Sequence, residues 1–260
     1  MADTVLRKCD GPIATLTLNR PDRFNALTLE LVRELTGAFW ELEADPDVRV
    51  ILLKGAGKAW CAGGDLDELL ALTRGTASQR RGYLTSFKAM IEAVRGVSKP
   101  IIASVQGVCV GGGNELNVAC DLTLASETAR FGQAGPRVGS VPVFGIPQDF
   151  QLLVGEKKSK EVTYLCRLYS AQEAEAMGWI NRAVPAGDLD RVTGEWAREI
   201  AEKSPTALAL AKRLHNLHHN LSSQAVDDGI ELLTFFWGTE EAREGLTAFR
   251  EKRKPEFHNA

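Results

Sequence analysis

Glu115 is the residue best placed to do chemistry, because it begins a helical pattern directly after a cluster of glycines. The stretch reads Val105-Gln-Gly-Val-Cys-Val-Gly-Gly-Gly-Asn-Glu115, and an apolar run over residues 101–105 leads into it. A strand, a glycine turn with exposed backbone N–H groups and a helix N-terminus together form a site for developing negative charge. A carboxylate beside such a site can move protons, so this stretch is our first candidate active site.

A second glycine turn, Gly63-Gly64, lies between another strand pattern and a helical pattern over residues 66–72. Each turn alone is explained by the need for a tight bend, and Glu115 alone by the favourable field of a helix N-terminus. Taken together, the two turns and the acid predict an oxyanion hole, in which two N–H donors stabilise a thioester carbonyl as it becomes an enolate. Losing one such donor raises a reaction barrier by about 3 kcal/mol.

The glycine-rich segment 55–65 does not match the phosphate-binding motifs that it superficially resembles. Trp60 stands where a dinucleotide-binding fingerprint needs glycine, and Leu52 stands where a P-loop needs one. We therefore interpret this segment as a glycine turn that offers backbone N–H groups rather than as a nucleotide site.

The cysteines and histidines give no support for a metal or redox centre. The five cysteines are scattered without CxxC spacing, which predicts reduced thiols of a cytosolic protein. A Cys–His nucleophile would need distant parts of the chain to meet, because every histidine lies late in the sequence. His215, His218 and His219 share one helical face, but no carboxylate completes a metal set at that spacing, so we expect a solvated surface cluster and no metal.

The elements that would position these residues alternate between strand and helix patterns. This alternation predicts a mixed α/β fold with a mostly parallel sheet covered by helices. We expect a polar loop over residues 73–79, and a pocket wall from the irregular, apolar segment 132–147. Strands are predicted over residues 4–9, 13–18, 48–53, 100–105, 121–125 and 129–131. Helices are predicted over residues 28–42, 66–72, 86–97, 148–154, 158–166, 171–177, 188–202 and 205–220, with further helix to residue 250.

Composition changes near Ser204 from mixed α/β to all helical, which divides the chain into a core, residues 1–203, and a helical region, residues 204–260. An apolar block at 232–237 in this region fits either core packing or a subunit contact. The basic run 252–254 would ordinarily be a solvated tail, but it could also meet a polyphosphate. The formal net charge is −3, and the N-terminus has no apolar signal core. No apolar run is long enough to cross a bilayer, so we expect a cytoplasmic protein with neither nucleic-acid nor membrane partners.

These motifs together resemble the enoyl-CoA hydratase/isomerase (crotonase) superfamily over nearly the whole chain. The resemblance implies a crotonase (ClpP-like) spiral of ββα units, a C-terminal helical trimerisation region, and a homotrimer or a hexamer made of two trimers. It also implies an acyl-CoA thioester substrate. The matching segments are Asn19-Arg20-Pro21 with Asn25-Ala26-Leu27, Ala62-Gly63-Gly64-Asp65-Leu66, Gly107 to Glu115, Phe131-Gly132-Gln133, Ala174 to Gly178 and Ser204-Pro205-Thr-Ala.

The resemblance also assigns roles to residues. Glu115 matches a catalytic glutamate of hydratases, and Gly64 and Gly112 match the two glycines of the oxyanion hole. Residues that would contact the substrate or coenzyme A are Arg23, Phe24, Ala26, Ala62, Gly63, Asp65, Leu66, Gly111, Ala134, Gly135, Ser140 and Lys252.

The sequence departs from hydratases at one position that matters. Hydratases usually read Phe-Gly-Gln-Pro-Glu, whereas this chain has Gly135 in place of the second glutamate. The segment up to Ser140 and the C-terminal ending are similar to dihydroxynaphthoyl-CoA synthases and to ring-opening hydrolases of cyclic acyl-CoAs. In the synthases, the glycine leaves room for a bicarbonate that acts as base. That branch also has an aspartate at the position of Pro142 and a tyrosine near that of Trp237, and both are absent here.

We therefore expect an acyl-CoA enzyme that stabilises a thioester enolate, namely an enoyl-CoA hydratase, a lyase with Glu115 as general acid and base. Alternatives are a ring-opening C–C hydrolase of a cyclic β-ketoacyl-CoA and an enoyl-CoA isomerase, which needs a single base. A non-catalytic or RNA-binding homologue is a further alternative, which the acidic net charge disfavours. No cofactor is expected beyond the coenzyme A of the substrate and an anion such as bicarbonate near Gly135.

Overall fold

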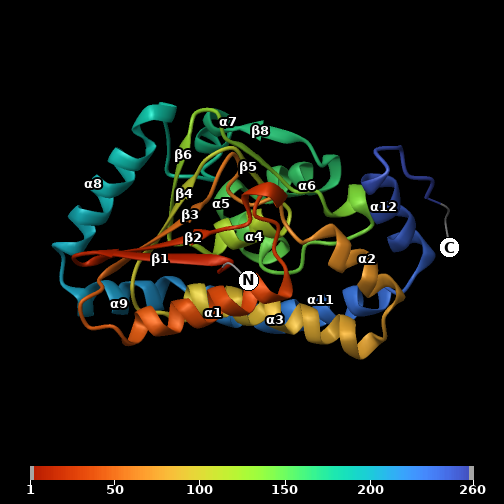
Figure 1. The fold of residues 1–260 in the computed structure, drawn as a ribbon, viewed down its shortest axis with the longest axis horizontal. Coiled ribbons are helices and arrows are strands. Elements are labelled where there is room, and N and C mark those ends of the chain that lie inside the picture. The colour runs from red at the N-terminus through yellow and green to blue at the C-terminus, as the bar shows by residue number, and fades with distance from the viewer. Residues whose placement is uncertain (1–2, 258–260) are drawn as a thin grey trace.

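A six-stranded sheet in the order β1-β2-β3-β4-β6-β9 forms the centre of the molecule (Figure 1). The computed structural model describes residues 3–257. The first two strands form an antiparallel hairpin, and each later strand adds in parallel. The strands are β1 (Val5–Asp10), β2 (Ile13–Leu18), β3 (Val50–Gly55), β4 (Ile101–Val105), β6 (Leu122–Ser126) and β9 (Arg182–Val184).

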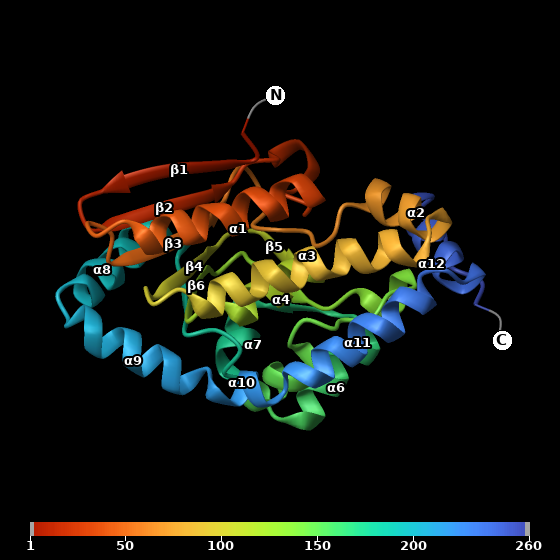
Figure 2. The same ribbon diagram turned by 90° about the horizontal axis from the view of Figure 1, so that it is seen from below.

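The inner strands β3 and β4 are continuous apolar runs because both of their faces are covered. Successive side chains of a strand point to opposite faces. Val50 and Leu52 accordingly pack in a small cluster with helix α8 (Leu189–Ala201), whereas Ile51 and Leu53 belong to the main core. The main core lies toward α1 (Leu29–Ala44) and α3 (Ala77–Gly96), which pack side by side (Figure 2).

A second, three-stranded sheet carries the chain into the candidate site. It consists of β5 (Val108–Val110), β7 (Arg130–Gly132) and β8 (Leu168–Ser170). The strand β5 leads directly to helix α4 (Gly112–Ala119), which bears Glu115 in its first turn, as expected. The sequence patterns did not predict β5, β8 or β9, because strands of three residues are too short to show an alternation of apolar and polar residues.

The prediction of a polar loop over residues 73–79 is wrong. Helix α2 (Leu66–Arg74) and helix α3 are separated by Gly75 and Thr76 alone. Thr76 and Gln79 form a reciprocal capping box, in which each side chain accepts a hydrogen bond from the other residue's backbone N–H. Small polar residues that suggested a loop are therefore the start signal of a long helix.

The segment 132–147 is irregular, as expected, but much of it is buried. It contains the short 3-10 helix η2 (Gly135–Val138) and leads into the π-helix η3 (Ile146–Phe150). Three helices follow: α5 (Gln151–Val154), α6 (Glu156–Leu165) and α7 (Ala171–Ala176).

Between residues 205 and 250 the chain is almost entirely helical, as the composition indicates. The helices are α9 (Pro205–His215), α10 (Leu217–Leu221), α11 (Ser223–Phe236) and α12 (Glu240–Arg250). Helix α11 packs along α3, and α12 packs against α2 and η2. The buried faces of α11 and α12 contribute to the main core, so these helices cover the same chain's residues 135–144 rather than forming a detached unit. Within residues 3–257, no helix combines the length and apolar character needed to cross a membrane.

Two glycine substitutions test this packing of α12. A Cβ at Gly245 would lie 2.5 Å from the backbone N of Gly139, whereas Gly37, in α1, has open space around it. We expect Gly245→Ala to destabilise the protein by about 1–3 kcal/mol through overpacking. We expect Gly37→Ala, the control, to stabilise it by about 1 kcal/mol because alanine favours the helix. Urea unfolding followed by tryptophan fluorescence measures both, and a Gly245→Ala midpoint at or above wild type would contradict the packing.

Candidate active site

The two glycine turns predicted to form an oxyanion hole are in contact. Gly63 has φ of +94°, and a Cβ there would lie 3.0 Å from the carbonyl O of Val110 and 3.1 Å from the N of Gly112. A Cβ at Gly112 would lie 3.6 Å from the N of Gly64. In the described part of the chain, neither the Gly64 nor the Gly112 N–H has a backbone acceptor. Both residues are partly exposed, so two adjacent N–H donors are free to bind a ligand oxygen.

The N-terminal loop holds the first turn in place. The N–H of Leu27 donates to the carbonyl of Gly63, and the N–H of Asp65 donates to the carbonyl of Leu27, so the two segments pair like short parallel strands. Asn25 supports the loop from beneath, because its buried side-chain amide donates to the carbonyls of residues 56 and 59. Asn25 adopts a left-handed backbone conformation, which asparagine tolerates better than most residues.

The predicted coenzyme A residues of these two segments lie side by side. The N–H of Ala62 donates to the carbonyl of Phe24 at 3.0 Å. The carboxylate of Asp65 caps helix α2 and accepts a hydrogen bond from Arg20 at 3.0 Å. Arg23 is exposed and pairs with Asp67 at 3.0 Å. The remaining predicted members of this group are Ala26, Gly63, Leu66 and Gly111, all in the same two segments or the adjoining glycine turn.

The carboxyl of Glu115 is buried, and its Oε1 accepts a hydrogen bond of 2.8 Å from the N–H of Phe144. Burial raises its pKa from the ordinary 4.5 to about 7, against the opposing effect of the N–H groups of Phe144 and Val143. A helix-capping acid on the surface would keep a low pKa, so the environment is not that of a simple cap. Near neutral pH both the acid and the carboxylate form of Glu115 are populated, which suits a group that must accept and return a proton.

Close packing around the glycine turn fixes the position of α4. A Cβ at Gly113 would lie 2.5 Å from the carbonyl O of Cys61, so only glycine fits there. Asn114, next to Glu115, accepts a hydrogen bond from the indole N–H of Trp179 at 2.9 Å. The thiol of Cys61 is buried, which raises its pKa to about 12, and burial likewise raises the pKa of Cys109. Neither thiol therefore supplies a thiolate nucleophile.

At position 135, the structure shows a closed turn instead of a second acid. Gly135 is buried, and a Cβ there would lie 3.0 Å from the carbonyl O of Ser140 and 3.2 Å from the Cδ of Pro142. The side-chain oxygen of Ser140 accepts a hydrogen bond of 3.2 Å from the indole N–H of Trp237. The hydroxyl proton of Ser140 remains available to another partner. Ala134 directly precedes this turn and is partly buried.

Sequence reasoning missed the aromatic side chains behind this turn. Trp237 comes from the end of α11, and its ring centroid lies 5.9 Å from that of Tyr83 on α3. Tyr83 in turn packs on Phe87, which stacks on Phe144. Apolar spacing on α3 and the block at 232–237 indicated burial, but no local pattern indicates that these helices meet beside Glu115.

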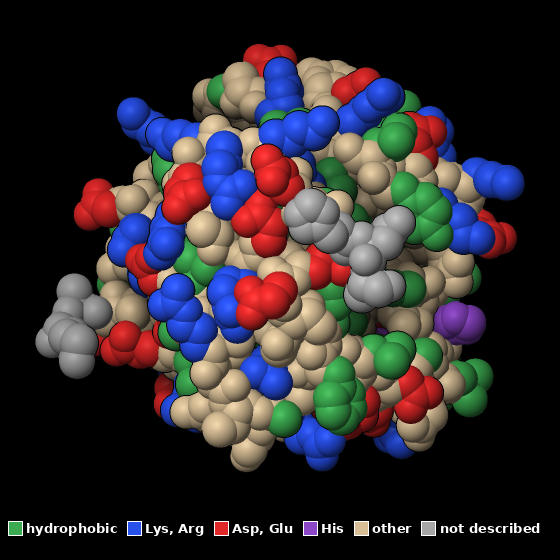
Figure 3. Space-filling view, turned by 90° about the vertical axis from the view of Figure 1, so that its right-hand side faces the viewer, with side chains coloured by type: hydrophobic (Ala, Val, Ile, Leu, Met, Phe, Trp, Pro, Cys, Tyr) green, Lys and Arg blue, Asp and Glu red, His purple; other side chains and the backbone are tan. Residues whose placement is uncertain are grey.

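Lys252 is the predicted coenzyme A residue farthest along the chain. It follows α12, is exposed and has a left-handed backbone conformation. Basic and acidic side chains are interspersed on the face of the molecule at this end (Figure 3). Its role as a phosphate contact stays a prediction. Of the predicted surface histidines, His219 differs from expectation, because its Nδ1 lies 2.9 Å from a carboxylate oxygen of Asp149 and its side chain is largely buried.

The chain is similar to one known protein family and to several solved structures over most of its length. The model of the enoyl-CoA hydratase/isomerase family matches residues 8–260. An enoyl-CoA hydratase/carnitine racemase structure from Magnetospirillum magneticum is 33% identical, with a TM-score of 0.80 and coverage of 99% of this chain and 96% of that one. An enoyl-CoA hydratase/isomerase from Xanthobacter autotrophicus Py2 is 30% identical, with a TM-score of 0.86 and coverage of 95% of this chain and 93% of that one. An enoyl-CoA hydratase from Bacillus anthracis is 31% identical, with a TM-score of 0.79 and coverage of 98% of both chains.

The chain therefore belongs to the enoyl-CoA hydratase/isomerase (crotonase) family, and it has the crotonase fold that the sequence motifs predicted. Enzymes of this family act on acyl-CoA thioesters, so the family supports an acyl-CoA hydratase or isomerase activity without distinguishing between the two.

Burial of Glu115 predicts a pH-dependent effect on stability. A carboxyl whose pKa is raised in the folded state contributes stability below pH 4.5, and this stability is lost as pH rises through about 7. Glu115→Gln keeps the hydrogen-bond acceptor but cannot ionise. We expect it to raise the free energy of unfolding by up to about 3 kcal/mol at pH 8 and to leave it unchanged at pH 4. Urea unfolding at the two pH values measures the difference, and an equal effect at both would refute the buried ionisation.

Proposed function

We propose that the protein is an enoyl-CoA hydratase in which Glu115 performs both proton transfers. The observation that carries this proposal is the buried carboxyl with a pKa of about 7 on the helix that follows one of two glycine turns, each with an unpaired N–H. Such donors suit the oxygen of a thioester carbonyl, and a single carboxyl near its neutral point can act first as base and then as acid.

In the proposed reaction the thioester oxygen accepts hydrogen bonds from the N–H groups of Gly64 and Gly112. The carboxylate of Glu115 removes a proton from water as the water oxygen bonds to the β-carbon. The electron pair of the double bond moves into the thioester, which becomes an enolate stabilised by the two N–H donors. Protonated Glu115 then returns the proton to the α-carbon, so that one water is added and the enzyme is regenerated.

The reacting water, or a small anion such as bicarbonate, is proposed to lie beside the closed turn at Gly135. A hydratase with a second glutamate would use it to hold the water. Here Ser140 offers a hydroxyl proton, because Trp237 already donates to its oxygen. We propose that this hydroxyl orients the water, and that the missing acid makes the reaction depend on Glu115 alone.

Double-bond isomerisation is the second candidate, and the single carboxyl favours it. A 3-enoyl-CoA becomes a 2-enoyl-CoA when one base removes an α-proton and returns it to the γ-carbon, with no water added. In the described residues, the hydrogen bonds to Glu115 come from backbone N–H and no second carboxylate pairs with it.

Assembly into a homotrimer or hexamer in the cytoplasm is also proposed. Leu210, Leu214, Leu217 and Leu221 are exposed on α9 and α10 at a helical spacing, which forms an apolar stripe suited to a neighbouring copy. Light scattering of the purified protein tests this, and a monomer at micromolar concentration would contradict it.

Substrate turnover distinguishes the two reactions. We expect crotonyl-CoA to gain 18 Da as water adds, and a 3-enoyl-CoA to keep its mass if isomerisation occurs alone. Cyclic enoyl-CoA and β-ketoacyl-CoA thioesters belong in the same panel, with ring integrity checked separately. Glu115→Gln should lower kcat by about 10²–10⁴-fold. Glu156→Gln, which removes an exposed carboxyl on α6, is the matched control and should retain full activity. Undiminished turnover by Glu115→Gln would refute the role of this residue.

The pH profile gives an independent check. Only the carboxylate form of Glu115 can accept a proton, and its pKa is about 7. We expect kcat/KM to fall about tenfold per pH unit below that value and to level off above it. A profile that stays flat from pH 5 to 8 would exclude Glu115 as the base. Added bicarbonate that raises the plateau would indicate that an anion occupies the turn at Gly135.

A further inference from the structure

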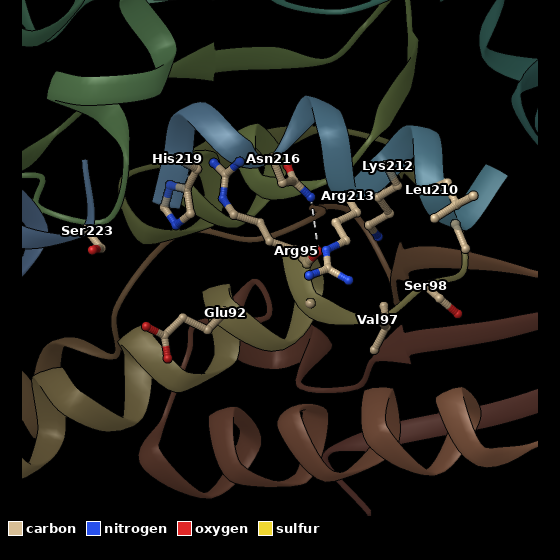
Figure 4. Close-up of a pocket in the computed structure, with 12 residues that line it drawn as sticks. Glu92, Arg95, Val97, Ser98, Leu210, Lys212, Arg213, Asn216, His219 and Ser223 are labelled. Atoms are coloured by element: carbon tan, nitrogen blue, oxygen red, sulfur yellow. Dashed lines mark hydrogen bonds between the residues drawn. The ribbon is translucent and has the colours of Figure 1, made fainter. Parts of the chain in front are cut away.

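Arg80 is buried in the first turn of α3, where a positive charge opposes the helix dipole. Its hydrogen bonds all go to backbone carbonyls, and within residues 3–257 it forms no ion pair with a carboxylate. Arg95, near the other end of the same helix, is also largely buried, but it pairs with Asp149 at 2.8 Å beside the α9–α10 segment (Figure 4). The charge of Arg80 must therefore be stabilised in a different way.

The guanidinium of Arg80 joins the C-terminal ends of two helices. Its Nη1 donates to the carbonyls of Leu72 and Gly75, at 3.3 Å and 2.7 Å, where α2 ends. Its Nε donates to the carbonyl of Thr234, at 2.6 Å, in the last turn of α11. The last carbonyls of a helix lack intrahelical donors and carry partial negative charge. Two helix ends thus take the place of a carboxylate partner, where the α2–α3 and α11–α12 turns meet (Figure 2).

The guanidinium also packs tightly on the turn between α11 and α12. A Cβ at Gly238, directly after Trp237, would lie 2.7 Å from Nη2 of Arg80 and 3.1 Å from its Cζ. The planar fork of arginine reaches carbonyls in two directions from this position, whereas the ammonium of a lysine is a point charge. The contact is therefore specific for a guanidinium.

Each of the two helices that Arg80 joins is connected to one side of the proposed site. Helix α2 begins two residues after Gly64, and a Cβ at Gly64 would lie 3.1 Å from Cδ1 of Leu69 on that helix. Helix α11 ends directly before Trp237, whose indole N–H donates to the side-chain oxygen of Ser140 at 3.2 Å. One end of the clamp therefore leads to a proposed oxyanion donor, and the other leads to the hydroxyl that would orient the water.

Tyr83, one turn beyond Arg80 on α3, contacts the same two sides. Its hydroxyl oxygen lies 3.5 Å from the carbonyl O of Leu27, a residue that pairs with Gly64. Its ring centroid lies 5.9 Å from that of Trp237. The start of α3 is therefore packed between the two sides, and Arg80 is the polar side chain that binds this helix to both.

We propose that Arg80 is a positioning residue, which sets the separation of the Gly64 turn and the Trp237–Ser140 pair by binding the ends of α2 and α11. This inference rests on the proposed function, in which Gly64 binds the thioester oxygen and Ser140 orients the water. Without the guanidinium, the end of α11 is released from α2, and the water is displaced relative to the thioester. The segments predicted to bind coenzyme A, residues 23–26 and 62–66, make no contact with Arg80, so substrate binding is retained.

Hydration of crotonyl-CoA by Arg80→Gln tests the role, at a temperature where circular dichroism shows the variant to be folded. We expect kcat to fall about 10–100-fold, as for a small displacement of a reacting group, and KM to stay near the wild-type value. Arg81→Gln is the matched control, because Arg81 is the next residue and joins α3 to α11 through an exposed ion pair with Glu231. It should keep the wild-type kcat. A wild-type kcat in folded Arg80→Gln, or equal losses in both variants, would overturn the proposal.

The indole N–H of Trp237 gives a readout that does not depend on turnover. In ¹⁵N-labelled protein its NMR signal, identified by its loss in Trp237→Phe, should shift in Arg80→Gln as the hydrogen bond to Ser140 is lost, and should stay in place in Arg81→Gln. If Arg80→Gln does not fold, Arg80→Lys decides the question, since it keeps the charge without the planar fork and should shift the same signal. An unmoved signal would overturn the proposal. Absent turnover in the wild type would instead refute the proposed reaction, and the NMR result would stand independently.

Discussion

The hydrogen bond from the N–H of Phe144 to the buried carboxyl of Glu115 is the contact on which the rest of the site depends. A carboxylate moved out of water is strongly destabilised unless hydrogen bonds compensate, and here the compensation is partial, so the pKa settles near neutrality. The backbone at 143–144 must therefore be held firmly. Val143 packs beneath Gly229 of α11, and Phe144 packs on Phe87 of α3. The environment of this one acid thus depends on helices that hold the backbone of its hydrogen-bond partner.

A steric constraint governs the other half of the site. In the proposed oxyanion hole, the two glycine turns must approach closely enough for two N–H groups to reach the same oxygen, and a single Cβ in the wrong place would separate the turns. A Cβ at Gly107 would lie only 1.9 Å from the carbonyl O of Lys58, and one at Gly113 would collide with Cys61. The glycines are therefore required by the contact between backbones. The hydrogen bonds between Leu27, Gly63 and Asp65 then fix the first turn at its proper distance.

Much of this site could be predicted from sequence because its determinants are local. Each glycine turn follows a strand, and Glu115 lies in the first turn of a helix, so residue types and spacing sufficed to predict these local elements. The partner of Glu115 could not be anticipated, since it is a backbone N–H, which every residue except proline possesses, and it lies 29 residues away. The meeting of Trp237 with Ser140 spans 97 residues and leaves no periodic signal. The loop prediction at Thr76 fails for a different reason. A threonine that caps a helix and a threonine in a loop look alike in sequence, and only the structure shows the reciprocal hydrogen bonds with Gln79.

The contacts of α11 and α12 with residues 135–144 have a consequence for how the protein is made. Both glycine turns and Glu115 are synthesised before the C-terminal helices, whereas Trp237 and Gly245, which contact Ser140 and Gly139, are synthesised near the end of the chain. A nascent or prematurely terminated chain therefore contains both glycine turns while Ser140 and the backbone at 143–144 still lack their cover. Because the raised pKa of that carboxyl requires burial, the proposed role of Glu115 depends on the docking of the helices that hold residues 143–144. The proposed acid–base group is in this sense complete only when synthesis of the chain is complete.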